Sequence, residues 1–335
     1  MNQPLPFVSV IMPVRNEAGY IERSLDAVFA QDYPADLFEV IVADGMSGDG
    51  TREIVRQRQT RHPNLRLIDN RGLIAPTGLN AAIAESRGEV IVRVDGHCEI
   101  APDYLHNCVE HLRKDGVDGV GGPIETVGET AAASVIAAAI SSRFGVGGSA
   151  FRTVKGKTRL TDTVAFPAYT RAAIERAGAF DEELVRNQDD EYNYRLRKLG
   201  AKILLAADVR ARYYSRSTIR SLVRQYFQYG YWKVRVLQKH PRQMSIRQFI
   251  PPLFVAALLG AMLLAPILPS GWRLAAIICG CYLGANLVAS ARLARKVGWP
   301  HSFLLPPVFA SLHISYGLGF LVGLIKFAPR WWESR

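Results

Sequence analysis

Asp95 and His97 are two side chains whose types and spacing could do chemistry together. They flank Gly96 directly after Val90–Val94, a β-branched run long enough for one buried strand of a parallel sheet. Ligands of open α/β sheets bind outside the carboxyl ends of the strands, where a carboxylate and an imidazole could hold one divalent cation. An Asp-Gly turn after any strand would leave the same residues, so this stretch alone leaves both interpretations open.

Two further predicted strands also end on polar residues. The apolar runs 7–12 and 38–43 are followed by Pro13, Arg15, Asn16 and Glu17 in the first case, and by Asp44 and Asp49 in the second. Helical spacing is expected over 17–29, 51–59 and 76–86, with a short strand over 65–68. This alternation predicts an α/β fold with a parallel sheet and right-handed crossovers. The polar strand ends then meet at one edge, as a nucleotide-diphosphate site requires. The alternative is that the acids are solvated loop residues, which fits any one strand end better than all of them together.

Taken in order, these motifs resemble the family-2 glycosyltransferases of the GT-A fold. The residues that carry the resemblance are Pro13–Glu17, Asp44–Thr51, Asp95–His97, Phe180–Glu182 and Gln188–Gly200. The resemblance covers roughly residues 7–215 and is closest to the bacterial exopolysaccharide branch, of succinoglycan type. It implies a Rossmann-like, mostly parallel sheet. It also implies an inverting enzyme that moves one sugar from a UDP-sugar, with UDP-glucose as the expected donor.

The same resemblance implies which residues contact the donor. They are Pro13, Arg15, Asn16, Glu17, Asp44, Arg71, Asn80 and Asp95. A carboxylate at Asp44 could accept the imide N–H of uracil, which makes its type chemically sensible there. Asp49 more simply makes a turn and caps the next helix. The family often has Arg directly before Asn80, whereas this chain has Leu79. Arg71 and Arg93 are candidates for neutralising the charge of the diphosphate, and a strand-end ion pair is the alternative for Arg93.

Asp95 and His97 occupy the positions of the family's Asp-x-Asp metal motif. Most members have a second Asp there, so His97 is a departure. Imidazole suits Mn²⁺ better than Mg²⁺, which prefers oxygen ligands. We therefore expect Mn²⁺, with Mg²⁺ as the alternative, bound chiefly by Asp95 and the donor diphosphate. The alternative for His97 is a hydrogen-bonding residue of the loop.

The segment Asn187–Glu191 is a second chemical centre. Alignment with the family motif places the catalytic base at Asp189, which would accept the proton of the acceptor hydroxyl. Asp190, Glu191 and Gln225 are assigned to the acceptor side. Gln188 replaces the usual Glu. The alternative is a helix start rich in acids because of the helix dipole alone.

Charge divides the chain unevenly. Residues 211–335 contain 16 of the 41 Lys and Arg residues but only one of the 30 acids, Glu333. Basic charge beside long apolar runs favours an anionic membrane over nucleic acid, and no zinc-finger or RNA-binding motif is found. No signal-peptide pattern precedes the first strand, and the four cysteines show no disulfide spacing. We therefore expect a cytoplasmic catalytic domain.

The stretch 216–248 is basic and aromatic and is predicted to lie in the lipid headgroup region, with its cations on phosphates. A helix packed on the catalytic domain is the alternative. Its sequence around Gln225 lacks the Gln-x-x-Arg-Trp motif of processive synthases, which favours transfer of one sugar per encounter.

Uncharged runs at 249–268, 274–291 and 297–325 are long enough to suggest about three membrane spans. A third span would carry Lys326 and Arg330 outward, against the positive-inside rule. A re-entrant segment at Pro306-Pro307 is therefore the alternative to three spans.

The sequence predicts three parts: a catalytic domain over 1–215, interfacial helices over 216–248 and a transmembrane region over 249–335. We expect a multi-pass protein of the bacterial inner membrane that glycosylates a hydroxyl of a polyprenyl-diphosphate-linked saccharide. A polysaccharide-assembly complex is a further expected partner. The alternatives are a polyprenyl-phosphate sugar synthase and a catalytically silent nucleotide-binding component of such a complex.

Overall fold

The computed structural model describes residues 4–154, 156–215 and 218–331. The chain packs as two compact units, one of Met1–Glu125 with Ala150–Tyr214 and the other of Thr126–Ser149 with Ser215–Arg335. Residues 126–149 thus group with the C-terminal part. The expected boundary after residue 215 falls at residues 216–217, outside the described part. Because packing does not say which segment catalyses or meets a membrane, the three-part functional division stays a prediction.

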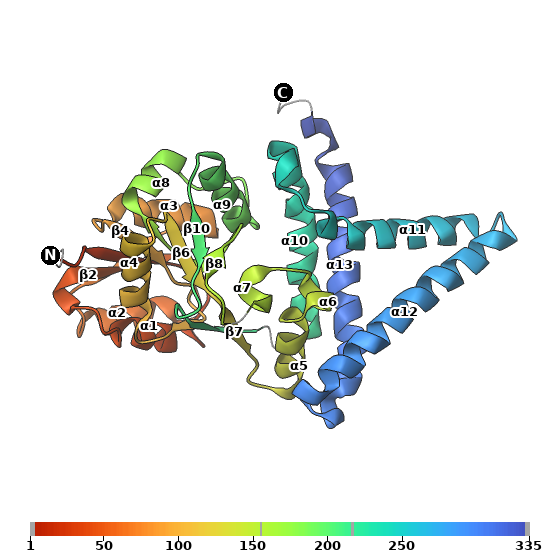
Figure 1. Cartoon of the computed structure of the whole chain (residues 1–335), viewed down its shortest axis with the longest axis horizontal. Coiled ribbons are helices and arrows are strands. Elements are labelled where there is room, and N and C mark those ends of the chain that lie inside the picture. The colour runs from red at the N-terminus through yellow and green to blue at the C-terminus, as the bar shows by residue number, and fades with distance from the viewer. Residues whose placement is uncertain (1–3, 155, 216–217, 332–335) are drawn as a thin grey trace. The chain divides into compact units, whose positions relative to one another are not determined.

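The first unit is built on an eight-stranded sheet with the order β3-β2-β1-β4-β9-β6-β10-β8 (Figure 1). These strands are β1 Val8–Val14, β2 Phe38–Asp44, β3 Leu65–Asp69, β4 Val90–Arg93, β6 Gly119–Gly122, β8 Arg159–Leu160, β9 Ala165–Thr170 and β10 Ile203–Leu205. The first four pair in parallel, while β9 is antiparallel to both of its neighbours. The predicted, mostly parallel α/β sheet is confirmed.

Helices cover both faces of this sheet, so its strands are buried on both sides. Val10 and Met12 of β1 belong to one apolar cluster, and Ile11 between them belongs to another, as the two-residue repeat of a strand requires. The helices are α1 Ile21–Phe29, α2 Thr51–Gln59, α3 Ala75–Glu85, α4 Tyr104–Lys114, α7 Ala150–Thr153, α8 Arg171–Ala177 and α9 Gln188–Lys198. A small sheet of β5 Cys98–Ile100, β11 Ala211–Tyr214 and β7 Ile124–Val127 accompanies them.

The second unit is helical in its described part. Its α-helices are α5 Ala131–Ile140, α6 Arg143–Val146, α10 Ile219–Lys239, α11 Ile250–Leu264, α12 Pro269–Val297 and α13 Leu305–Lys326. Among the described residues, three helical segments are long and apolar enough to cross a membrane: Ile246–Leu264, Pro269–Val297 and Trp299–Lys326. They contain most of the runs that the sequence marked as spans. Pro306-Pro307 lies in the first turn of α13, where proline fits a helix, and does not interrupt it.

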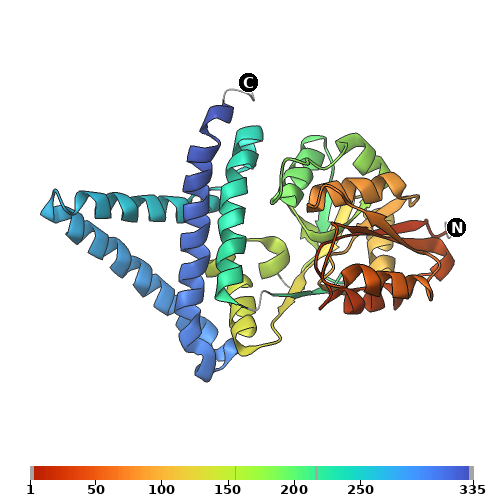
Figure 2. The same ribbon diagram turned by 180° about the vertical axis from the view of Figure 1, so that it is seen from behind.

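Helix α10 runs beside α13 in views from both sides (Figure 2). Lys233 and Arg235 of α10 are buried within this unit, 2% and 6% exposed. The expectation that all cations of this stretch face lipid phosphates is therefore wrong for these two. Arg235 instead donates a hydrogen bond to Gln238 and lies over the ring of Phe327.

Candidate active site

The polar ends of the central strands lie at one edge of the sheet. The pairing of β1 with β2 sets Val14 opposite Asp44, and the pairing of β1 with β4 sets Ile11 opposite Arg93. Asp95 therefore follows β4 at the same edge, as the sequence predicted. Parallel strands produce this result because their carboxyl ends necessarily point the same way.

Hydrogen bonds connect the loop after β2 to the loop after β1. The backbone N–H of Asn16 donates to Ser47 Oγ at 2.8 Å, and Asn16 Oδ1 accepts from the backbone N–H of Gly48 at 3.1 Å. Asn16 adopts a left-handed conformation with φ 55°, which Asn tolerates better than most residues. Asp49 accepts from the backbone N–H groups of Ala18 and Thr51 at 3.0 and 3.1 Å, so its carboxylate shapes this corner.

Asp44 is fully buried at the end of β2. Its Oδ2 accepts from the backbone N–H of Ser47 at 2.9 Å and from Arg52 Nη1 at 2.8 Å. Its Oδ1 is enclosed and has no hydrogen-bond partner in the described part of the chain. Arg52 also donates to Asp69 at the end of β3, at 2.7 Å. An acceptor oxygen without a donor is costly, and a ligand N–H would satisfy it.

Arg93 joins two carboxylates that the sequence placed in separate motifs. Its Nε donates to Asp95 Oδ1 at 2.9 Å, and its Nη1 donates to Asp189 Oδ1. Burial on its own would lower the pKa of Arg93, but the charges of Asp189 and Asp95 outweigh burial and raise it. Arg93 is thus a fixed cation at the end of β4. The alternative of a strand-end ion pair, weighed from the sequence, is what the structure shows.

Asp189 lies in the first turn of α9, where the positive end of the helix dipole favours an anion. Burial raises the pKa of Asp189 above its ordinary value. The Arg93 charge opposes that rise, while the negative charges of Asp95 and Asp190 add to it. A carboxylate whose pKa is raised in this way is a better proton acceptor than an ordinary surface aspartate.

His97 is fixed by a carboxylate from the loop after β1. Its Nδ1 lies 2.9 Å from Glu17 Oε1, and its ring meets that of Tyr213 edge-on, with centroids 5.1 Å apart. Its Nε2 has no hydrogen bond to any residue that the structure describes. Metal-binding histidines usually donate their other ring N–H to a carboxylate in this manner. No three His, Cys, Asp or Glu residues of the described chain gather as a ready-made metal site, so any metal here needs ligands from elsewhere.

Two other predicted site residues, Asn80 and Glu191, form hydrogen bonds with neighbouring residues of the chain. Both oxygens of Glu191 accept from Arg195, at 2.8 and 3.0 Å. Asn80 donates to the carbonyl of Phe180 and to Glu182, both at 2.9 Å, and accepts from the Phe180 N–H at 2.8 Å. These contacts position the loop and helix that carry Asp189. The donor role of Asn80 and the acceptor role of Glu191 stay predictions.

The remaining predicted residues lie in different parts of the fold. Pro13 lies inside β1, Arg15 donates to the carbonyl of Leu73 at 3.2 Å, and Arg71 is exposed after β3. Gln225 belongs to α10 in the other unit, where its amide donates to the Tyr229 hydroxyl at 2.9 Å. Their donor or acceptor roles, and that of the half-buried Asp190, stay predictions.

Comparison with known proteins identifies the family. Residues 9–177 match the sequence profile of glycosyl transferase family 2. Succinoglycan biosynthesis protein ExoA of Rhizobium meliloti (strain 1021) is 31% identical over 324 residues, which cover 96% of each chain. The chain belongs to glycosyl transferase family 2. The predicted relationship to exopolysaccharide enzymes of succinoglycan type is confirmed.

Two further proteins are similar to this chain, one in sequence and one in fold. A dolichyl N-acetyl-alpha-D-glucosaminyl phosphate 3-beta-D-2,3-diacetamido-2,3-dideoxy-beta-D-glucuronosyltransferase of Methanococcus voltae is 28% identical over 96% of this chain and 98% of its own. The mannosyltransferase PcManGT of Pyrobaculum calidifontis, solved with GDP-Man and Mn²⁺, superposes with a TM-score of 0.59 and 23% identity. The match covers 94% of this chain and 87% of that one. This likeness confirms the GT-A fold. The chain is a glycosyltransferase of polysaccharide or lipid-linked oligosaccharide biosynthesis.

Sequence reasoning missed Arg52 altogether. It considered Arg93 for the charge of the diphosphate, but not as a partner of Asp189. Arg52 could have been found from its position, because it stands one residue after the start of the helix that follows the Asp44 turn. Arg93 is the last residue of an otherwise apolar strand, and a charge there needs a partner when buried. The sequence could not show which partner, since Asp189 lies 96 residues away.

Proposed function

We propose that this protein is a membrane-anchored, inverting glycosyltransferase. It transfers one sugar, with glucose as the expected one, from a UDP-sugar to a hydroxyl of a polyprenyl-diphosphate-linked saccharide. The observation that carries the proposal is the bridge that Arg93 forms between Asp95 and Asp189. It joins the carboxylate assigned to the donor and metal with the carboxylate assigned to the acceptor proton.

Asp189 is the base of the proposed reaction. It accepts the proton of the acceptor hydroxyl as that oxygen attacks the anomeric carbon from the side opposite the diphosphate, so the configuration inverts. Arg93 favours the ionised form of the partly buried Asp189, because a nearby cation stabilises the charged form of a carboxyl group. An acceptor phosphate would already be ionised and would need no base. The Asp189 arrangement therefore favours a hydroxyl acceptor over polyprenyl phosphate.

Asp95 and His97 would hold a divalent metal together with the donor diphosphate. The His97–Glu17 hydrogen bond supports this assignment, because it leaves the other ring nitrogen for a ligand. A bound metal would neutralise charge on the departing diphosphate. PcManGT was solved with Mn²⁺, and imidazole suits that ion, so Mn²⁺ is the metal we propose.

Asp44 would recognise the uracil. Its buried Oδ1 is an acceptor without a donor, and the imide N–H of uracil is a donor of the required kind. Because the carboxylate is fully buried, the base can reach it only if a neighbouring side chain moves. Arg52, which lies on the other oxygen, is the side chain that would turn aside.

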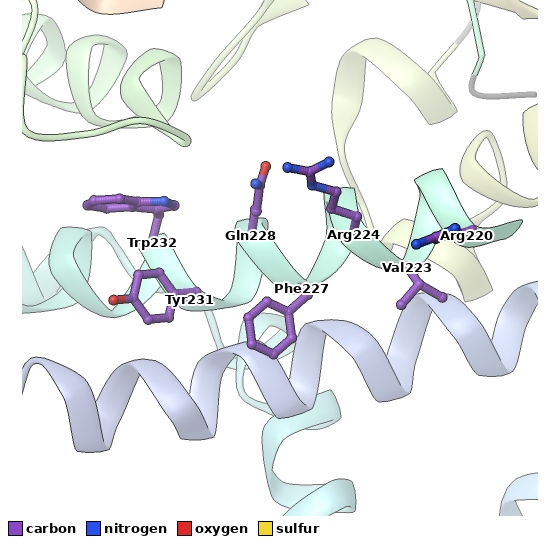
Figure 3. A pocket seen from close by; sticks show the side chains of 7 residues that line it. All are labelled: Arg220, Val223, Arg224, Phe227, Gln228, Tyr231 and Trp232. Carbon is purple, nitrogen blue, oxygen red and sulfur yellow. The ribbon is translucent and has the colours of Figure 1, made fainter. Parts of the chain in front are cut away.

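A groove of about 550 Å³ along α10 supports a lipid-linked, anionic acceptor (Figure 3). Arg220 and Arg224 lie one turn apart at its N-terminal end and make no ion pair with the described residues. Phe227, Tyr231 and Trp232 line the rest of it. Guanidinium groups bind phosphates, and the aromatic rings offer apolar contact to a hydrocarbon chain. The Methanococcus voltae relative, by its name, also acts on a lipid-linked sugar phosphate.

The reaction is tested with membranes that contain the full chain, UDP-[¹⁴C]glucose, Mn²⁺ and polyprenyl-linked saccharides extracted from bacterial membranes. We expect a labelled lipid product and its loss by about 10²–10⁴-fold in Asp189→Asn, with UDP affinity unchanged, because only proton transfer is removed. Asp36→Asn, at an exposed position outside the site, is the control. Full turnover by Asp189→Asn would refute the assignment of the base.

The acceptor groove is tested separately with Arg220→Ala/Arg224→Ala. We expect a higher KM for the lipid acceptor and an unchanged KM for UDP-sugar, because a phosphate group loses its two guanidinium partners. Arg242→Ala removes an exposed arginine just after α10 and serves as the matched control. Equal acceptor KM values in the double variant and the control would exclude the groove as the lipid site.

A further inference from the structure

Helices α10 and α13 run in the same direction along nearly their whole length. Phe227 lies against Gly319 and Tyr231 against Gly323, and the Gln238 side chain donates to the carbonyl of Phe327 at 2.8 Å. Residue numbers thus rise together on both helices. Wherever α13 lies in or on a membrane, α10 lies beside it at the same depth.

Glycines make this contact too close to be incidental. A Cβ at Gly319 would come within 2.0 Å of the Phe227 carbonyl oxygen, and one at Gly230 within 2.0 Å of the Tyr316 carbonyl oxygen. Side chains larger than hydrogen at these points would push the two backbones apart. The pair is therefore a fixed structural element, of the small-residue kind that brings helices into close contact.

The charges of α10 are incompatible with a membrane-crossing orientation of this pair. Five of its residues are Lys or Arg and none is acidic. Arg224 and Lys233 are nine residues apart, about 13 Å along a helix, whereas the hydrocarbon core is about 30 Å thick. In a crossing pair at least one of them would lie at the depth of the hydrocarbon, where a charged side chain is strongly disfavoured.

Helices α11 and α12 show the opposite character. In their most apolar windows only 17% of residues are buried within the unit, against 44% for α13. Large apolar side chains such as Leu253, Leu263 and Ile277 are more than 60% exposed. The two helices form a hairpin whose turn lies near residues 265–268 and whose open ends both contact α13 or the residues just before it (Figure 1). Such a surface needs hydrocarbon around it.

We propose that the α11–α12 hairpin is the element that crosses the bilayer, and that the α10–α13 pair lies along the membrane surface. The chain then crosses twice, although α13 by length and composition could cross too. The end of α13 at Lys326 consequently lies on the same side of the membrane as Thr218, where α10 begins. This goes beyond the proposed reaction and does not depend on it.

The distribution of basic residues agrees with two crossings. The basic residues near the end of α12 and at or after the end of α13 all fall on the side of the α10–α13 pair; they are Arg292, Arg295, Lys296, Lys326 and Arg330. Only Arg273 lies near the hairpin turn. A third crossing would instead place Lys326 and Arg330 on the opposite side from the other basic clusters, against the positive-inside rule.

Labelling of single cysteines tests this topology in the full chain. Cys279 and Cys281, both exposed on α12, are first replaced by Ala, while the buried Cys98 and Cys108 remain. Three variants, Thr60→Cys, Ser270→Cys and Ala328→Cys, then place an exposed thiol in the catalytic domain, at the hairpin turn and after α13. Bacterial cells that make each variant are treated with a membrane-impermeant maleimide before or after lysis.

We expect Ser270→Cys to be labelled in intact cells, and Thr60→Cys and Ala328→Cys only after lysis. Labelling of Ala328→Cys in intact cells would overturn the proposal in favour of a third crossing. Protection of Ser270→Cys until lysis would overturn the crossing of the hairpin. Because labelling requires no turnover, either failure would leave the proposed glycosyltransferase reaction untouched.

Discussion

Arg93→Met tests whether a buried cation keeps the base ionised. Two unit charges 4 Å apart interact by about 4 kcal/mol at an effective dielectric constant of about 20. The Asp189 side chain is 40% exposed, and solvent screens such a pair, so we take about 1–2 kcal/mol for its loss. This corresponds to about a fivefold to thirtyfold higher proton affinity of Asp189.

We expect the acid limb of the pH profile of kcat/KM to shift to higher pH by about one unit in Arg93→Met. The pKa of Asp189 rises because removing a cation favours the neutral form of its carboxyl group, so a higher pH is needed to ionise it. Mn²⁺ and UDP-sugar are kept saturating, because Arg93 also pairs with Asp95. Arg93→Lys retains a positive charge and is the control.

The reasoning would be refuted by an unchanged acid limb in a folded Arg93→Met enzyme. A lower activity at every pH with the same profile would show instead that Arg93 acts on the donor. Binding of UDP, measured separately by calorimetry, distinguishes the two effects.

Three further predictions concern the metal, the sheet and the helix pair. His97→Asp should shift the metal preference from Mn²⁺ toward Mg²⁺, because it replaces imidazole with an oxygen ligand; an unchanged activity profile across the two metals counts against a ligand role. Burial alone would raise the pKa of Glu39, but hydrogen bonds from Arg87 and Ser9, together with the Arg87 charge, lower the pKa overall. The ionised Glu39 therefore stabilises the folded chain at pH values above the pKa that Glu39 has in the unfolded chain. This stabilisation is lost as the pH falls. Glu39→Gln should therefore cost about 1–3 kcal/mol at pH 7 and less near pH 4, as thermal unfolding in detergent would reveal; an equal loss at both pH values contradicts this. Gly319→Val should lower the unfolding temperature of the detergent-solubilised chain, whereas Gly284→Val, which meets open space, should not; equal effects would argue against the α10–α13 contact.

Sequence patterns alone predict where along the chain the chemistry lies. Short β-branched runs that end in polar residues are recognisable without a structure, because burial on both faces demands an apolar strand and its end alone can carry charge. Asp44 and Asp95 are placed in this way and by their likeness to family motifs, whereas Asp189 is placed by that likeness alone. The three long apolar helices were visible for a similar reason, since hydrocarbon thickness fixes the length of a span.

Only the tertiary structure decided how these residues are connected. Arg93 reaches Asp189 across 96 residues, and His97 reaches Glu17 across 80, and local patterns carry no information at such separations. Sequence reasoning places the basic, aromatic α10 in the lipid headgroup region, with its cations on phosphates. Its Gly230 instead meets α13, because two backbones approach that closely only where side chains are missing on both helices. The sequence showed the glycines and the charges, but only folding showed that they share one helix pair.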